Sequence, residues 1–325
     1  MLKNCLFAAS IAGFLFSQSC STVSETPVTS RSNPLKGMNF YVDDDSVVAQ
    51  ELSRLANAEA DTSAALDYLA KQPAAVWFGG WSGPIRQAVA KEVEKAEASQ
   101  THLVAVPYNV PYRDCGQYSS GGLKADSYRQ WIDDFAAGLG QHKAVIILEP
   151  DAIPLINCLS AQAKEERWQL LHFALETFKS KTQALVYMDI GHGNWVPAGI
   201  LEGRLREIGI DKADGFAINT SNYQSTEDSV AFGKKLIHRF PGKSFVIDTS
   251  RNGFGPSDDN AWCNPRGRAT GYPPQVVQDE PGLDAYLWIK RPGESDGECN
   301  GGPKAGHFWP EIATELVKNS PYAQQ

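Results

Sequence analysis

Short apolar runs alternate with amphipathic segments along most of this chain, from Gly37 onward. A run such as Ala144–Leu148, apolar at every position, is typical of a strand that is buried on both faces in a parallel sheet. Strands are expected at Met38–Val42, Ala74–Phe78, Leu103–Pro107, Ala144–Glu149, Ala184–Asp189, Gly215–Asn219, Ser244–Asp248 and Ala285–Ile289. Helices are expected at Pro84–Ala98, Ala125–Leu139, Gln162–Ser180, Leu201–Ile208, Glu227–Phe240 and Pro310–Val317.

This alternation predicts the α/β class, with right-handed crossovers and a parallel sheet. Seven or eight such units indicate a single domain built as a closed barrel, and a doubly wound open sheet is the alternative. No dinucleotide fingerprint or phosphate-binding loop stands at a strand-to-helix turn. The region Arg251–Pro281 is long, irregular and rich in Gly and Pro. A loop of that length is usually functional.

The composition is that of an ordinary soluble globular protein, with 325 residues of which 42% are apolar and 21% charged. The formal net charge of −8 argues against nucleic acid as a partner, because phosphates require a basic surface. The eight tryptophans supply many flat apolar faces. Core packing is the ordinary use of each one.

The first twenty residues are typical of a signal peptide. Lys3 is followed by the apolar stretch Leu6–Phe16, which is too short to span a bilayer, and then by small residues before Cys20. Cys20 suggests a lipoprotein, although a Leu three positions earlier is missing. Residues 21–32 are rich in Ser and Thr, which is typical of a linker. We therefore expect an exported protein, secreted or held at the outer surface, that touches membrane only through a lipid on Cys20.

Four cysteines remain once Cys5 and Cys20 are set aside: Cys115, Cys158, Cys263 and Cys299. An even number in an exported chain indicates two disulfides, and three pairings exist. Zinc binding is the alternative, but no pair has the close spacing of a zinc motif.

Polar and aromatic residues follow six of the expected strands. In a parallel barrel these carboxyl ends form the active site. The residues are Tyr108, Arg113 and Asp114, then Asp151, then Asp189, His192, Asn194 and Trp195, then Asn219, Asn222 and Tyr223, then Asp248, Ser250 and Arg251, then Lys290, Glu294 and Asp296.

Asp151 stands directly after the apolar strand that ends at Glu149-Pro150. Burial disfavours the charged form of a carboxyl, which is how a general acid near neutral pH is made. The alternative is that Asp151 caps the next helix. The other acids also have plain alternatives: Asp114 could pair with Arg113, Asp189 could brace its strand, and Asp296 could be solvated.

Several acids together with Trp77, Trp195 and Trp262 favour a sugar site. Pyranose rings stack on indoles, and breaking a glycosidic bond needs one acid to protonate the leaving oxygen and a second carboxylate to assist water or attack. A metal held by Asp114, Asp189 and Asp296 is the competing hypothesis.

Six ordered segments together resemble glycoside hydrolase family 6, the inverting cellulases. They are 108–115 (YNVPYRDC), 148–151 (LEPD), 189–195 (DIGHGNW), 219–223 (NTSNY), 262–265 (WCNP) and 290–297 (KRPGESDG). The resemblance extends from about Asn33 to the C-terminus, and an ordered set is far more specific than any one motif.

The resemblance implies a distorted parallel β/α barrel over residues 33–325 that hydrolyses β-1,4-glucan with inversion. By motif position, Asp151 matches the proton donor, and Asp114 matches the neighbour that keeps it protonated and helps to position water. Asp296 matches the base, which could act through a water chain. Asp189 matches a further acid near the cleavage point, and Tyr108 matches a tyrosine that helps to distort the sugar.

The resemblance also implies substrate contacts and covalent links. Ser120 fits a serine that contacts water on a mobile loop. The positions matching sugar-binding residues are Trp77, His192, Trp195, Asn222, Trp262, Lys290 and Glu294. The implied disulfides are Cys115–Cys158 and Cys263–Cys299.

The chain departs from the family pattern at Arg291, at Ser295 and after Trp77, where Phe78-Gly79-Gly80 puts one side-chain contact in doubt. Short stretches after Asp114 and Asp296 favour an open cleft, and hence internal cleavage by an endoglucanase. A cellobiohydrolase of the same family, a non-catalytic glucan-binding protein and the metal-dependent hydrolase are the alternatives. With no appended carbohydrate-binding module expected, the substrate would be soluble or amorphous cellulose or cello-oligosaccharides. We expect a monomer with no cofactor and no metal.

Overall fold

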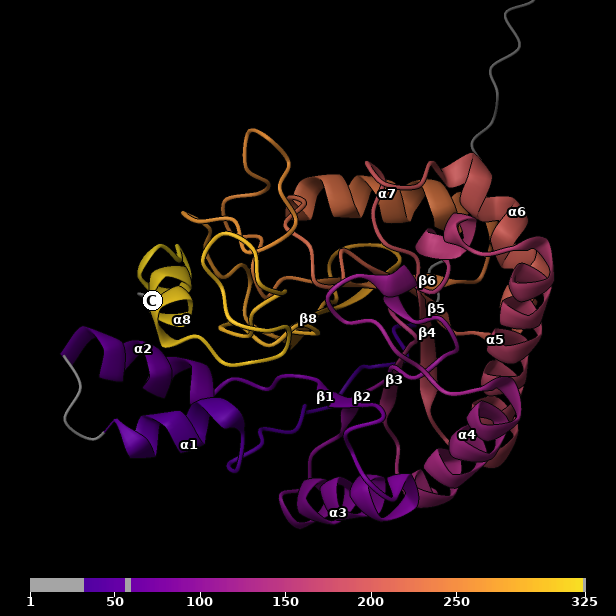
Figure 1. Cartoon of the computed structure of the whole chain (residues 1–325), viewed down its shortest axis with the longest axis horizontal. Helices are drawn as coiled ribbons and strands as arrows, with labels where there is room; N and C mark the ends of the chain where they lie inside the picture. Colours follow the sequence, from indigo (N-terminus) through magenta and orange to yellow (C-terminus); the bar gives the residue numbers. More distant parts are fainter. Residues whose placement is uncertain (1–31, 56–59, 324–325) are drawn as a thin grey trace, which may run out of the picture.

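The computed structural model describes residues 32–55 and 60–323 (Figure 1). The expected signal peptide, the lipidation of Cys20 and all but the last residue of the expected linker lie outside the described residues. Within the described ranges, no helix combines the length and apolar character needed to cross a membrane.

An eight-stranded, almost entirely parallel sheet forms the centre of the molecule, in the order β1-β2-β3-β4-β5-β6-β8-β7. The strands are β1 (Val76–Phe78), β2 (Val104–Pro107), β3 (Val145–Leu148), β4 (Leu185–Asp189), β5 (Gly215–Ile218), β6 (Ser244–Asp248), β7 (Gln275–Val276) and β8 (Leu283–Leu287). Only β7 is antiparallel, and it pairs with β8. The predicted α/β class and parallel sheet are confirmed.

The sheet curls into a distorted barrel whose two sides meet at β1 and β8. Among the described residues these two strands share no ladder. Instead, the Ala75 N–H donates to the Trp288 carbonyl at 2.9 Å, and the Trp77 indole Nε1 donates to the Ile289 carbonyl at 2.7 Å. The predicted single-domain barrel is therefore confirmed. Hydrogen bonds close the seam between β1 and β8.

Strand β3 shows why the apolar runs are unbroken. Val145 and Ile147 belong to the core inside the curled sheet, whereas Ile146 and Leu148 belong to the core between the sheet and its helices. All four are at most 1% exposed. Because successive side chains of a strand point to opposite faces, burial on both faces requires an apolar residue at every position.

Five helices arc around the outer face of the sheet, each packed on the next (Figure 1). They are α3 (Ile85–Ala98), α4 (Ala125–Leu139), α5 (Ala161–Lys181), α6 (Ala198–Ile208) and α7 (Thr226–Arg239). The short 3₁₀ turns are η1 (Asp114–Gly116), η2 (Pro154–Cys158) and η3 (Ile210–Lys212). The predicted helices in this arc are found within a few residues of their expected ends.

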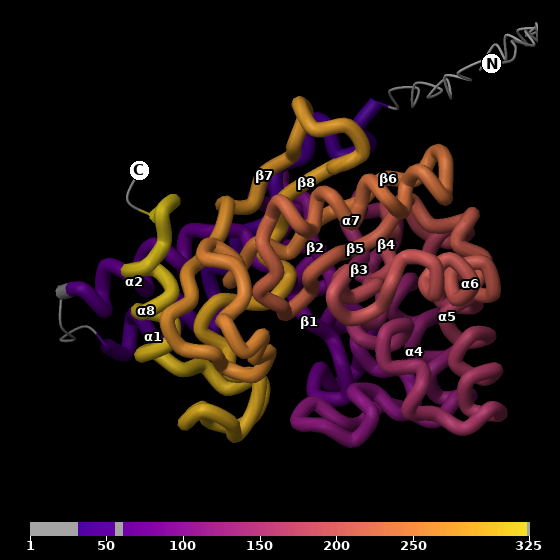
Figure 2. The backbone as a smooth tube through the Cα atoms, turned by 90° about the horizontal axis from the view of Figure 1, so that it is seen from above, coloured from indigo at the N-terminus to yellow at the C-terminus, as the bar shows by residue number. Residues whose placement is uncertain are grey.

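A second group of helices, α1 (Val47–Arg54), α2 (Ala60–Ala70) and α8 (Pro310–Lys318), packs together beside the β1/β8 seam, as both views of the chain show (Figures 1 and 2). Its core is built on Leu66 and Trp288. The sequence interpretation found α8 but missed α1 and α2. Helix α1 is only eight residues long and has no fully buried residue.

The expected first strand, Met38–Val42, is wrong. This segment makes a single parallel bridge, between Phe40 and His102. Strand β1 already pairs with β2 over Ala105–Pro107, so only the position before β2 is left for Phe40. Met38 and Phe40 instead pack in the core inside the curled sheet.

Candidate active site

The carboxyl ends of the strands carry an unusual number of left-handed backbone conformations. The φ angles are 56° at Asp114, 45° at Glu149, 67° at Asp151, 67° at Asn219 and 58° at Ser221. Residues other than glycine are uncommon in this region, although Asp and Asn tolerate it best, and clusters of such residues gather at functional sites. This cluster therefore marks the rim that the sequence had indicated.

Two buried carboxylates hold the rim loops in these conformations. Glu149 accepts hydrogen bonds from the backbone N–H groups of Asn109 (2.9 Å) and Val110 (3.1 Å). Asp248 accepts from the N–H groups of Ser221, Ser250 and Lys290, each at 2.9 Å. Each carboxylate thus ties the loop after its own strand to neighbouring loops. The sequence interpretation had not separated these structural acids from the chemical ones.

Asp151 lies between two of the predicted partners. Its Oδ2 accepts a hydrogen bond from the Tyr108 hydroxyl at 3.3 Å, and its backbone N–H donates to Asp189 Oδ2 at 2.9 Å. The helix-capping alternative is not what the structure shows, because Ser160 caps α5. Burial, reinforced by the negative charges of Asp189 and Asp114, raises the pKa of Asp151 well above its usual range. Asp151 is therefore a carboxyl suited to give up a proton near neutral pH.

Asp189 and Asp114 differ in their surroundings. Asp189 is 1% exposed, and burial raises its pKa to about 6. Asp114 is partly exposed on η1, where its Oδ2 accepts from the Ser119 N–H at 2.7 Å. Burial raises the pKa of Asp114 as well, against the opposing effects of that hydrogen bond and of Arg113. Arg113 itself donates to the backbone carbonyls of Tyr108, Ser119 and Ser120.

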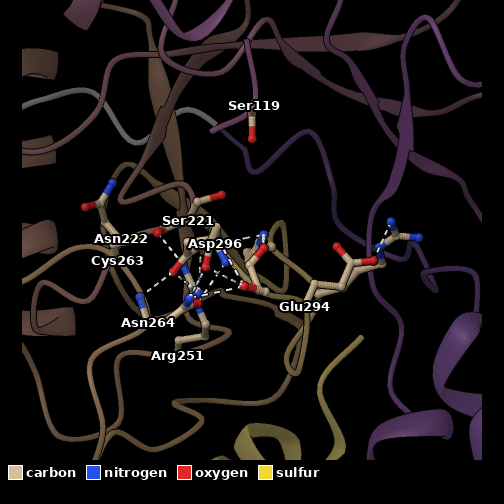
Figure 3. Close-up of polar contacts among 12 residues, drawn as sticks. Ser119, Ser221, Asn222, Arg251, Cys263, Asn264, Glu294 and Asp296 are labelled. Carbon is tan, nitrogen blue, oxygen red and sulfur yellow. Dashed lines mark hydrogen bonds and ion pairs between the residues drawn. The ribbon is translucent and has the colours of Figure 1, made fainter. Parts of the chain in front are cut away.

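Asp296 sits at the centre of a polar cluster (Figure 3). Both of its oxygens accept from Arg251 Nη1, at 3.0 and 2.9 Å, and Lys290 Nζ lies 3.6 Å from Oδ1. The Asn264 N–H donates to Oδ2 at 3.0 Å, and the Tyr223 hydroxyl does so at 3.4 Å. Although burial acts to raise the pKa of Asp296, the charges of Arg251 and Lys290 prevail and lower it. This carboxylate stays ionised.

Aromatic residues of the expected sugar site have distinct settings. The Trp262 side chain is 46% exposed, so it is no core residue. Trp77 is partly buried at the seam and meets the Tyr108 ring edge-on at 5.1 Å between centroids. Trp195 is partly buried 5.9 Å from the His192 ring. Burial lowers the pKa of His192 to about 4, so this imidazole is neutral at neutral pH.

The remaining predicted binding residues divide into two groups. Asn222, Ser120 and Lys290 lie on the loops around the acids, and Asn222 and Lys290 are partly buried. Glu294 points away from the Asp296 cluster and pairs with Arg291 at 2.5 Å (Figure 3). It is 6% exposed and lines a separate cavity of about 40 Å³. The structure therefore places Glu294 at the margin of the site.

The two disulfides are those that the resemblance implied. Cys115–Cys158 and Cys263–Cys299 each have a Cα–Cα separation of 6.2 Å. The first ties η1 to η2, and the second ties the Trp262 loop to the segment after Asp296. In residues 32–55 and 60–323, no three His, Cys, Asp or Glu side chains are grouped so as to hold a metal ion.

The main omission of the sequence interpretation was the set of partners that hold Asp296. Arg251, Tyr223 and Asn264 had been noticed only as rim or motif residues. Asn264 both donates to the Asp296 side chain and accepts from its backbone N–H at 2.8 Å. A buried Arg after a strand, within reach of an expected base, was the available signal.

A curled parallel barrel with several acids at the carboxyl ends of its strands is an architecture that glycoside hydrolases can use. Comparison with known proteins specifies the family. Residues 35–320 match Glycosyl hydrolases family 6, and the chain belongs to that family.

Relatives and solved structures agree with this assignment. Endoglucanase A of Cellulomonas fimi is 42% identical over 289 residues, which are 88% of this chain and 62% of that protein. Endoglucanase 1 of Streptomyces halstedii is 38% identical over 86% of this chain and 88% of its own length. The structure of the Mycobacterium tuberculosis endoglucanase Cel6 in complex with methyl-cellobiosyl-4-deoxy-4-thio-β-D-cellobioside is 40% identical, with a TM-score of 0.85 over 90% of this chain and 100% of that one.

Proposed function

We propose that this protein hydrolyses β-1,4-glucosidic bonds in cellulose or soluble β-glucan with inversion, and that it cuts within the chain. The observation that carries the proposal is the setting of Asp151 in a family 6 barrel. Its raised pKa, its bond from Tyr108 and the nearby charges of Asp189 and Asp114 suit a proton donor. The homologous endoglucanases support the same activity.

The roles follow from the electrostatics of each acid. Asp151 would protonate the leaving oxygen, and Asp114 and Asp189 would keep it protonated by repulsion between like charges. Asp296 would act as the base through water that Asp114 and Ser120 help to position. Because its pKa is lowered, Asp296 is ionised and free to accept the proton that this water gives up as the water attacks the sugar.

The sugar contacts are assigned from exposure and position. Trp262 offers an exposed face for stacking, while Trp77, Trp195, His192, Asn222 and Lys290 would bind sugars along the rim, with Glu294 at its margin. We also assign residues 1–20 to a signal peptide, 21–32 to a linker and 33–325 to the catalytic domain. The two disulfides support export, since such bonds persist in oxidising compartments.

The stereochemical test uses proton NMR of the first product from a soluble β-linked glucan. Single displacement gives the α-anomer, so α-signals should appear before mutarotation. Asp151→Asn should abolish this hydrolysis while cello-oligosaccharide binding persists. Asp126→Asn, at an exposed acid on α4, is the matched control and should retain full activity. An early β-anomer, or an active Asp151→Asn variant, would refute the assignment.

The mode of attack is tested separately. Internal cleavage should cut the viscosity of a soluble β-glucan steeply per reducing end released. A cellobiohydrolase of the same family, the alternative, would release reducing ends with little loss of viscosity.

A further inference from the structure

The loop of residues 114–121, called here the Asp114 loop, is firmly fastened at its base. Arg113 and Gly121 form an antiparallel bridge, and the Arg113 guanidinium donates to the carbonyls of Ser119 at 2.8 Å and Ser120 at 3.3 Å. The Ser119 N–H donates to the Asp114 side chain. Cys115 adds the covalent link to Cys158. The position of this loop is therefore set without any help from its tip.

The tip of the Asp114 loop reaches the other side of the site. The Tyr118 ring lies against the backbone of Gly297, where an added Cβ would stand 2.2 Å from Tyr118 Cγ. It also lies 6.2 Å from the Trp262 ring, between centroids. Figure 3 shows Ser119 of the Asp114 loop opposite Cys263, Asn264 and Asp296. Two segments far apart in sequence thus meet next to Asp296, which directly precedes Gly297.

Side-chain packing makes this contact. In the described part of the chain, no hydrogen bond or ion pair joins residues 116–118 to Trp262 or Gly297. Each side is held by its own disulfide, so neither depends on the contact for its fold. Tyr118 nevertheless remains 49% exposed and Trp262 46% exposed. A large aromatic ring left half exposed beside a second one, above a polar site, offers a stacking surface that the fold itself does not require.

We propose that Tyr118 is a substrate-binding residue, which stacks on a pyranose ring of the glucan beside the ring that Trp262 holds. The proposal rests on the proposed glucanase function and deepens it. Because the two rings belong to opposite loops, a glucan that stacks on both is held across the site. Tyr118 would act on substrate affinity. The chemical step belongs to the acids, and the loop that carries Asp114 is fastened independently of its tip.

The alternative is that Tyr118 only keeps the Asp114 loop in place. The two roles separate in the kinetics. Loss of a stacking contact raises KM and Kd and spares kcat. Displacement of the loop would instead lower kcat, because Asp114, Ser119 and Ser120 would move.

The test compares Tyr118→Ala with Tyr118→Phe in the full chain. Hydrolysis of cellohexaose gives kcat and KM, and titration of the same variants carrying Asp151→Asn gives Kd by tryptophan fluorescence. Tyr118→Ala should raise both KM and Kd about five- to tenfold, the effect of one aromatic contact, with kcat within about twofold. Tyr118→Phe keeps the ring and should stay within about twofold of the unaltered enzyme on all three constants.

Phe254→Ala is the matched control, because Phe254 is a similarly exposed aromatic (54%) that lines a different cavity. It should change none of the three constants. An unchanged KM and Kd in Tyr118→Ala, an equal loss in Tyr118→Phe, or a fall in kcat alone would overturn the role of Tyr118 while leaving the glucanase assignment standing. Absence of glucan hydrolysis by the unaltered enzyme would overturn both.

Discussion

The raised pKa of Asp151 depends on neighbours that are distant in sequence. Its carboxyl is paired with the Tyr108 hydroxyl and surrounded by the charges of Asp189 and Asp114, contributed by different loops. Asp296, an acid of the same chemical type, has the opposite shift because Arg251 and Lys290 reach it. The same type of side chain is therefore held protonated more readily in one place and held ionised in the other.

Asp189→Asn should move the alkaline limb of the pH profile of kcat/KM to lower pH. As the proposed donor, Asp151 would work only while it is protonated, and the Asp189 charge helps to raise the pKa of Asp151. Removing that charge lets Asp151 ionise at lower pH, whereas the new amide oxygen can still accept the Asp151 N–H. Profiles measured beside Asp126→Asn as a charge control check this. A limb that stays in place or moves to higher pH would contradict the coupling.

At the scale of elements, the acids follow the ends of the strands, and the helices pack against those strands. Helix α5 packs on α4 and α6 and on β4, the strand that ends at Asp189. It begins at a side-chain cap, in which Ser160 Oγ accepts from the Ala163 N–H at 3.3 Å. This helix was predictable from the sequence, because its length and the spacing of its apolar residues are visible along the chain.

Ser160→Ala should lower the free energy of unfolding by about 1 kcal/mol, since an N-cap hydroxyl satisfies an otherwise unpaired helix N–H. Urea denaturation followed by circular dichroism measures the change. Ser180→Ala, near the end of the same helix, is the control, because its hydroxyl donates to the Glu176 carbonyl and caps no N–H. Its effect should stay within about 0.5 kcal/mol. Equal losses in the two variants would argue against the cap.

In the whole molecule, the seam between β1 and β8 and the two disulfides complete the site. The loops that bear Asp114 and Asp296 come from opposite ends of the strand order, and each is tied down covalently. The helix group α1, α2 and α8 packs beside the seam, with Trp288 in its core (Figure 2). The rim therefore forms only when the barrel closes, because no single β/α unit contains all of its residues.

Replacing Cys263 and Cys299 together by Ala should lower the free energy of unfolding by about 2–4 kcal/mol, as expected for a cross-link that restricts the unfolded chain. The pair Cys115 and Cys158 is a matched comparison. The sequence separations are 36 and 43 residues, and the entropy depends only on the logarithm of loop length. The two double variants should therefore lose similar stability in urea titrations. A neutral result for either would show that its disulfide does not restrict the unfolded chain in this way.

Seven of the eight expected strands and all six expected helices were predictable because burial repeats along the chain. The failures have physical reasons. Met38–Val42 has a strand-like pattern, but β1 occupies the edge that it would need. Helix α1 spans only eight residues and buries none of them fully, and β7 spans only Gln275–Val276, so both are too short to stand out along the chain.

The sequence by itself determined the unbroken apolar strands, the helices between them and the acids that follow the strand ends, because these depend on neighbours along the chain. The motif resemblance also anticipated the disulfide pairs. Only the tertiary structure decided which acids are structural, which acid has a raised pKa and which acid stays ionised. It also decided that the Tyr118 ring lies beside the Trp262 ring. Those outcomes depend on distances between loops, which closure of the barrel sets.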